Sequence, residues 1–141
     1  MTAQYFIDSN VLLYAGSQHP DDQRKRAVAL DLLRKPDLGF SAQVMQEYFN
    51  VAYTKARLGI SIEVALENLE WLARRTTLPI TPGLVIRATR TAARYKISYW
   101  DAAIISAAQE LGCHTLFSED LNHGQDYGGV RVIDPFLQTG E

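Results

Sequence analysis

Two acidic residues closely follow short apolar runs of the chain. Asp8 ends the segment 4–8, and Asp120 comes shortly after the segment 114–117. Such runs are typical of buried strands, and in open α/β sheets ligands bind where the carboxyl ends of the strands meet. A turn or capping carboxylate is the ordinary alternative at each position. Because the pattern occurs twice, we predict a functional site at this edge of a sheet.

Two further acids stand on predicted helices. Glu47 lies on the polar side of a helix over about residues 42–57, near Gln43. A glutamate on such a face is usually only solvated. Asp101 lies in the first turn of a helix that begins at Ser98, and Ser98-x-x-Asp101 matches a capping box. The Asp101 carboxylate could therefore cap this helix, face a site, or do both.

These acids belong to an oxygen-rich set of side chains that also includes Ser9, Asn10 and Ser118. Hard divalent cations such as Mg²⁺ and Mn²⁺ prefer oxygen ligands, and a cation relieves the repulsion between clustered carboxylates. A bound metal could polarise a phosphodiester and generate hydroxide for in-line attack. Glu119 is the alternative to Asp120 as the fourth acid; we prefer Asp120 and expect Glu119 to point to solvent.

Other kinds of site fit the sequence less well. The three histidines and the single cysteine lack zinc-site spacing, and residues 120–124 depart from a calcium loop. Glycine-rich dinucleotide and phosphate loops and a Gly-x-Ser-x-Gly elbow are all missing from the sequence. These observations argue against zinc, nucleotide-cofactor and serine-hydrolase chemistry.

The basic residues give a modest indication of nucleic-acid binding. Arg87, Arg90 and Arg94 share one face of a predicted helix, and they are the first candidates for RNA phosphate contact, although such stripes are often solvated faces. Tyr99 and Trp100 could stack on a base, but we expect Trp100 to pack in the core. The net charge of −2 provides no global positive field, so any nucleic-acid contact must be local.

Predicted helices separate the strand-like segments and would position these residues. The strand-like segments are 4–8, 38–41, 114–117 and 130–133, with an extended stretch at 78–81 and a glycine-containing loop at 122–129. Ser9 or Asn10 is expected to cap the first helix. The helix from Ser98 to Leu111 is apolar on nearly all sides, which predicts a central, buried position. The alternation indicates a parallel sheet in an α/β or α/β/α domain.

The composition is that of one soluble domain. The chain has 141 residues, of which 47% are hydrophobic and 21% charged. We expect no signal peptide, no membrane span and a cytoplasmic location, and the lone cysteine fits a reducing compartment. Residues 137–141 are expected to form a loose tail.

Taken together, the motifs resemble those of the PIN-domain family, in particular the VapC-type toxin ribonucleases of bacterial toxin–antitoxin systems. The resemblance spans nearly the whole chain and rests on four segments in order: Phe6-Ile7-Asp8-Ser9-Asn10, Gln46-Glu47-Tyr48, Trp100-Asp101-Ala102-Ala103-Ile104 and Leu116-Phe117-Ser118-Glu119-Asp120.

The resemblance implies a three-layer α/β/α sandwich with a central parallel sheet. It also implies a metal-dependent endoribonuclease that uses Mg²⁺ or Mn²⁺. The catalytic, metal-binding acids would be Asp8, Glu47, Asp101 and Asp120, supported by Asn10, Ser118 and Ser9. The partners it implies are an RNA substrate, a cognate antitoxin and a second copy in a homodimer. The apolar stripes of helices 42–57 and 61–74 could form a clamp for the antitoxin, although most of that surface is expected to pack internally.

Two alternatives remain open at this point. An aspartate-based phosphatase or receiver-like domain would use Asp8 as a phosphorylated nucleophile, but Asn10 stands where such phosphatases need a second aspartate. A non-catalytic module could bind RNA or protein on the same fold, although the complete set of acids argues against it.

Overall fold

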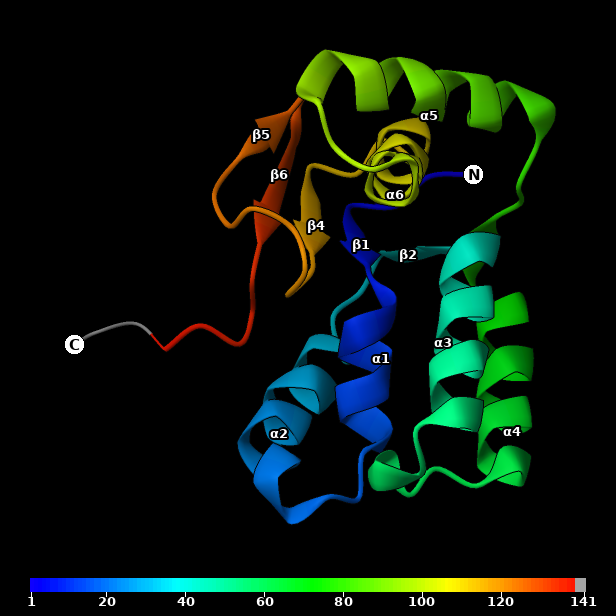
Figure 1. The fold of residues 1–141 in the computed structure, drawn as a ribbon, viewed down its shortest axis with the longest axis vertical. Coiled ribbons are helices and arrows are strands. Elements are labelled where there is room, and N and C mark those ends of the chain that lie inside the picture. Colours follow the sequence, from blue (N-terminus) through cyan, green and yellow to red (C-terminus); the bar gives the residue numbers. More distant parts are fainter. Residues whose placement is uncertain (139–141) are drawn as a thin grey trace.

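A six-stranded sheet organises the computed structural model, which describes residues 1–138. In spatial order the strands are β3, β2, β1, β4, β6 and β5 (Figure 1). Their bounds are β1 Tyr5–Ile7, β2 Leu38–Ser41, β3 Thr76–Leu78, β4 Thr115–Phe117, β5 Asp126–Tyr127 and β6 Val130–Ile133. All neighbours are parallel except β5 and β6. The strand order reverses at β1, and such a switch point opens a crevice at the carboxyl ends of the strands.

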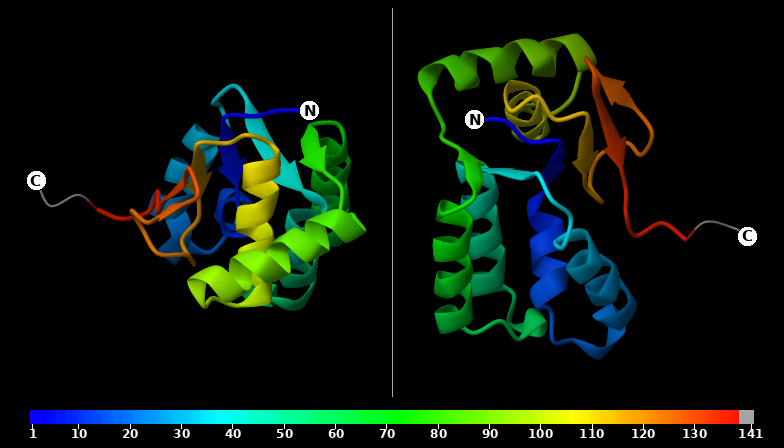
Figure 2. Two further views of the ribbon diagram at one scale, coloured as in Figure 1. Left: turned by 90° about the horizontal axis from the view of Figure 1, so that it is seen from above. Right: turned by 180° about the vertical axis from the view of Figure 1, so that it is seen from behind.

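Helices lie on both sides of the sheet, as the sequence predicted. Figures 1 and 2 show α5 and α6 on one side, with α1–α4 grouped on the other. Their bounds are α1 Ser9–Gly16, α2 Gln23–Leu32, α3 Ala42–Thr54, α4 Ile62–Ala73, α5 Pro82–Tyr95 and α6 Tyr99–Glu110. The prediction of a three-layer α/β/α fold is confirmed, with one antiparallel edge strand added to the parallel sheet.

Helix α6 forms the centre of the molecule, which confirms its predicted burial. Seven consecutive residues, 102–108, are buried. Most are alanines, and their small side chains allow the sheet and α5 to approach the helix closely. Gly39 on β2 is needed for the same reason, because a Cβ atom there would lie 2.9 Å from Leu111 Cδ1 and from Ala3 Cβ.

The structure corrects several predicted boundaries. The predicted loop 122–129 contains β5, which returns antiparallel to β6 because Gly128 and Gly129 take φ values of 61° and 98° in a two-residue turn. The extended stretch predicted at 78–81 instead forms β3 at Thr76–Leu78, since Thr81 caps α5. The predicted helix 42–57 ends at Thr54 and is followed by a 3₁₀ turn. The last three residues of the predicted tail, 139–141, lie outside the described residues.

The described chain contains no membrane-spanning helix: within residues 1–138, none is both long and apolar enough to cross a bilayer. The single cysteine, Cys113, is buried, and burial raises the pKa of its thiol to about 12. This thiol is therefore protonated at neutral pH and serves as a small core residue.

Candidate active site

Asp8 is the only residue between β1 and α1, at the carboxyl edge of the sheet. Its extended backbone and its side chain make it the N-cap of α1: Ser9 N donates to Asp8 Oδ1 over 2.7 Å. The prediction that Ser9 or Asn10 caps this helix was wrong, because the helix begins one residue earlier than expected. The other carboxylate oxygen, Oδ2, accepts from Ser118 Oγ at 2.7 Å and from Asn10 Nδ2 at 3.5 Å.

Burial dominates the electrostatics of Asp8. The residue is 5% exposed, and desolvation raises the pKa of its carboxyl group from 3.8 to about 7. Hydrogen bonds from Ser118 and Ser9 oppose this rise, whereas the negative charges of Glu47 and Asp120 add to it. A positive charge beside Asp8 would therefore make its carboxyl group ionise much more readily.

Asn10 links Asp8 to the segment that follows β4. Its Nδ2 donates to Asp120 Oδ2 at 3.1 Å and to Ser118 Oγ at 3.3 Å, and its Oδ1 accepts from Glu119 N at 3.2 Å. Ser118 Oγ also accepts from Asp120 N at 3.1 Å. This amide and hydroxyl therefore place the buried Asp8 carboxylate and the exposed Asp120 carboxylate in one hydrogen-bond network.

Glu119 is engaged elsewhere, and the expectation that it points to solvent was wrong. Its carboxylate accepts from Tyr14 Oη at 2.8 Å and forms an ion pair with Lys25. The side chain is 26% exposed. These contacts bind Glu119 to α1 and α2, while its neighbour Asp120 joins the network around Asp8. This arrangement favours Asp120 as the fourth acid.

Glu47 on α3 is connected to the start of α6 by Gln43, one helical turn earlier. Gln43 Nε2 donates to Glu47 Oε2 at 3.0 Å and to the Trp100 carbonyl oxygen at 3.1 Å, and Ser9 Oγ donates to Glu47 Oε1 at 3.4 Å. Burial raises the pKa of Glu47, and the charges of Asp101 and Asp120 raise it further. Gln43 was not predicted as a site residue; its signal was its place beside Glu47 on the polar stripe.

Asp101 lies in the first turn of α6. Ser98 caps the helix, as predicted, by accepting from Asp101 N at 3.1 Å. The reciprocal half of a capping box is not formed: within residues 1–138 the Asp101 carboxylate makes no hydrogen bond. Because this carboxylate raises the pKa of Glu47, it lies close enough to act electrostatically with the other acids.

Trp100 is exposed, so the prediction that it packs in the core was wrong. Its side chain is 65% exposed, and its ring meets Tyr99 edge to face at 4.9 Å. The position follows from the burial of residues 102–108, because the first turn of α6 extends beyond the core. A large aromatic side chain therefore stands in solvent next to a candidate metal ligand.

The donor set fits a hard divalent cation. All four candidate acids supply carboxylate oxygens, and the raised pKa values of Asp8 and Glu47 include mutual repulsion that a cation would relieve. Within the described residues, no three acidic, histidine or cysteine side chains form a preassembled metal-binding group. Mg²⁺ usually keeps several waters and takes only one or two carboxylates, so a closed cage is not required.

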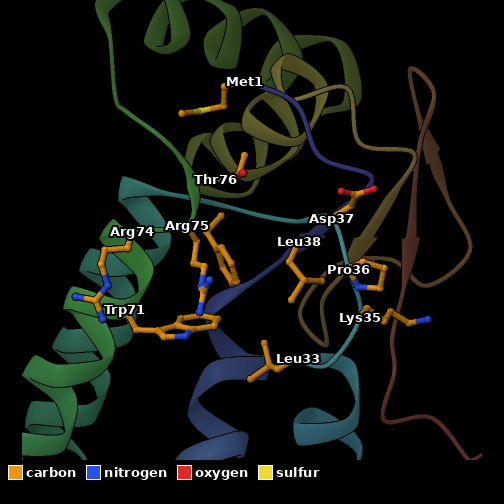
Figure 3. A pocket seen from close by; sticks show the side chains of 11 residues that line it. Met1, Leu33, Lys35, Pro36, Asp37, Leu38, Trp71, Arg74, Arg75 and Thr76 are labelled. Atoms are coloured by element: carbon orange, nitrogen blue, oxygen red, sulfur yellow. The ribbon is translucent and has the colours of Figure 1, made fainter.

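Two cavities differ in their relation to these acids. One, of about 670 Å³, lies beside β2 and α4, and Figure 3 shows Trp71, Arg74 and Arg75 along it. It contains none of the candidate acids. A smaller cavity of about 270 Å³ has Ser9 and Asp120 in its wall and adjoins the network described above. Of these two cavities, the smaller is the one that borders a candidate acid, Asp120.

The predicted arginine stripe lies on α5. Arg87 forms an ion pair with Glu110 of α6, Arg94 lies 5.2 Å over the Tyr95 ring, and Arg90 is exposed. None of the three lines the cavity beside the acids. Their contact with RNA phosphates stays a prediction.

Comparison with known proteins is consistent with this fold. The family model for the PIN domain matches residues 5–125, and the chain therefore belongs to the PIN-domain family. No curated protein sequence matches the chain.

Solved structures share the fold at low identity. A toxin–antitoxin complex from Klebsiella pneumoniae is 18% identical, covers 94% of this chain and 98% of its own, and has a TM-score of 0.68. VapC20 of Mycobacterium tuberculosis, a toxin that cleaves the sarcin–ricin loop, is 17% identical over 83% of this chain and 92% of its own, with a TM-score of 0.65. A DNA-bound VapBC from Salmonella typhimurium is 18% identical. The match covers 96% of this chain and 99% of that one, with a TM-score of 0.60.

Proposed function

We propose that the chain is a Mg²⁺- or Mn²⁺-dependent endoribonuclease, acting in the cytoplasm as the toxin of a toxin–antitoxin pair. The observation that carries the proposal is that Asp8 and Asp120 share hydrogen-bond partners at the carboxyl edge of a PIN-domain sheet, while the charges of Asp101 and Asp120 act on Glu47 and those of Glu47 and Asp120 act on Asp8. The fold alone does not define an activity, so the argument rests on this constellation.

Asp8, Glu47, Asp101 and Asp120 would hold the metal. When bound, the cation would activate water and neutralise charge developing on the scissile phosphate. Asn10 and Ser118 orient the Asp8 and Asp120 carboxylates through the hydrogen bonds given above, and Ser9 with Gln43 orients Glu47. Such supporting contacts typically change metal affinity or activity by about 10- to 100-fold when removed.

We propose RNA as the substrate because a structural neighbour, VapC20, is a toxin that cleaves the sarcin–ricin loop. Near the acids, the exposed indole of Trp100 supports this proposal, since unpaired bases stack on aromatic side chains. The arginines of α5 remain candidates for more distant phosphate contacts. The particular RNA depends on contacts that lie beyond the shared catalytic acids.

We further propose an antitoxin partner and a homodimer, since the neighbours include toxin–antitoxin complexes. On the described surface, α3 and α4 present exposed apolar side chains, among them Tyr53 at 67%, Leu66 at 49% and Ile62 at 47%. Only Ala65 and Leu72 of α4 are fully buried. The predicted apolar stripe of α4 is therefore only partly covered within the chain, which leaves surface for a partner.

The phosphatase alternative is less well supported. Such an enzyme needs a general acid near the nucleophile, whereas Asn10 supplies an amide that donates hydrogen bonds to Asp120 and Ser118. An amide does not transfer protons at neutral pH.

The test is cleavage of a mixed structured RNA pool with and without Mg²⁺ or Mn²⁺. Wild type, Asp8→Asn and Asp101→Asn would be purified under denaturing conditions and refolded, which removes an antitoxin and host nucleases. Asp31→Asn, which alters an exposed acid on α2, is the matched control. We expect metal-dependent cutting by wild type and control, and a loss of at least about 100-fold in the two site variants.

Equal cutting by all four proteins would refute the assignment of the acids and indicate a contaminant. If none cuts RNA, metal titration by calorimetry decides between the alternatives. Metal binding by wild type but not by Asp8→Asn would support the assigned metal centre. No metal binding by either protein would favour a non-catalytic module.

A further inference from the structure

The smaller cavity beside the acids carries features that the catalytic set does not use. It lies between α1, the end of α3 and the segment after β4, and its wall includes Asp120, Val51, Lys55 and Arg57. We call it the Lys55 cavity. Its volume of about 270 Å³ falls just below the range of about 300–1,000 Å³ typical of pockets for drug-sized ligands. A small group, such as one unit of a nucleic-acid backbone, suits it better than a complete cofactor.

Two of the charges in the cavity wall are already neutralised within the protein. Arg57 pairs with the buried Asp22 at 2.9 Å, and Glu119 pairs with Lys25. Lys55 is exposed and forms no ion pair within residues 1–138. Lys55 is thus the available cation of the described cavity wall, to which Asp120 also belongs.

Helix α3 connects this lysine to the acids. Glu47 and Val51 lie one turn apart on the same side of α3, and Lys55, the C-cap residue, directly follows the last helical residue, Thr54. At 1.5 Å per residue, Glu47 and Lys55 are separated by about 12 Å along the axis. This distance exceeds the span of one phosphate group. If the scissile phosphate of an RNA strand lies at the acids, Lys55 is therefore better placed to contact a neighbouring phosphate of the same strand than the scissile phosphate itself.

We propose that the Lys55 cavity binds a backbone phosphate of the RNA adjacent to the scissile one. This inference rests on the proposed nuclease function and adds a substrate contact outside the catalytic acids. An ammonium group that contacts a phosphate recognises its charge and not the identity of the base. This contact therefore strengthens binding to single-stranded RNA of any sequence.

A purely structural role is the competing explanation. Lys55 is the C-terminal cap residue of α3, and a cation there stabilises the partial negative charge of the helix end. Arg34 offers a matched control, because it is also exposed and follows the C-cap residue of α2, but it lines neither the cavity nor the acid cluster.

The test measures RNA binding as a function of salt in an Asp8→Asn background, which prevents cleavage. Fluorescence anisotropy with a short labelled single-stranded RNA of mixed sequence gives the association constant over a range of KCl concentrations. A lost phosphate contact reduces the slope of log K against log salt by about 0.7 for a single strand. We therefore expect Lys55→Ala to lower the slope by about 0.7 and the affinity by about fivefold at 0.1 M salt.

Lys55→Arg is expected to restore the slope, and Arg34→Ala is expected to retain it. Melting temperatures of all variants show that folding is intact. An unchanged slope in Lys55→Ala would overturn the site, as would an equal loss in Arg34→Ala, because the effect would then be one of overall charge. If the Asp8→Asn parent and the wild type both fail to bind RNA, the proposed function falls and the Lys55 site falls with it.

Discussion

Replacing Asp8 by asparagine should change how the stability of the metal-free protein depends on pH. In the folded chain, burial raises the pKa of Asp8 from 3.8 to about 7. Between these two values the folded state holds a proton that the unfolded state has lost. The slope of stability against pH is therefore negative in this window. The stabilising contribution is complete below pH 3.8 and is lost as the pH rises through about 7.

The size of this effect follows from the two pKa values. Each pH unit between them corresponds to about 1.36 kcal/mol, so the whole window amounts to about 4 kcal/mol of unfolding free energy. An asparagine cannot ionise and escapes this loss. It still accepts one of the hydrogen bonds made by Asp8, and losing another costs about 1 kcal/mol. That cost is the same at every pH, so the stability of Asp8→Asn relative to wild type should rise by about 3 kcal/mol from pH 5 to pH 8, for the roughly two pH units between pH 5 and the pKa of about 7.

Urea unfolding at several pH values measures this difference, with EDTA present to remove divalent ions. Circular dichroism follows the helices, and the fluorescence of the two tryptophans, Trp71 and Trp100, gives a second probe of the same transition. Asp31→Asn, an exposed acid on α2, controls for the loss of one negative charge. Parallel stability profiles for wild type and Asp8→Asn would refute the reasoning, because they would mean that Asp8 titrates alike in the folded and unfolded chains.

Three further outcomes are expected. Mn²⁺ at about 100 times its dissociation constant should stabilise wild type by about 2.7 kcal/mol but not Asp8→Asn; an equal rise in melting temperature in both would place the ion elsewhere. Trp100→Ala should leave stability nearly unchanged, because the side chain is 65% exposed. It should weaken RNA binding by about 1–3 kcal/mol, because base stacking is lost. RNA binding equal to that of wild type, or a changed oligomeric state, would contradict this role. Arg57→Ala should lower the free energy of unfolding by about 2 kcal/mol in urea, since it leaves the buried Asp22 without its ion pair; an unchanged midpoint would show the pair to be unimportant.

The boundaries that depend on neighbouring residues could be predicted from the sequence. The cap of α6, Ser98, was expected, and it accepts a hydrogen bond from the backbone amide three residues later, as Ser41, Ser61 and Thr81 do at the starts of α3, α4 and α5. Such contacts form within one turn and need no tertiary structure. The burial of α6 was also visible, because its apolar residues occur on nearly all sides.

Errors arose where a distant partner decides the outcome. Glu119 was expected in solvent, but Tyr14 and Lys25, which bind it, lie 105 and 94 residues earlier in the chain. Trp100 was expected in the core because tryptophan is strongly apolar, whereas the packing of α6 leaves its first turn exposed. The identity of these residues indicated their chemistry without indicating their surroundings.

The sequence by itself determined the kinds of group at the site and their order along the chain: acids after two strands and on two helices, with the amides and hydroxyls that can orient them. Only the tertiary structure decided which of these groups meet. Asn10 connects Asp8 to Asp120 although Asp120 is 110 residues away, and burial together with neighbouring charges raises the pKa of Asp8 to about 7. Desolvation and Coulomb interaction depend on distances in space, and these exist only once β1, β4, α3 and α6 have packed together.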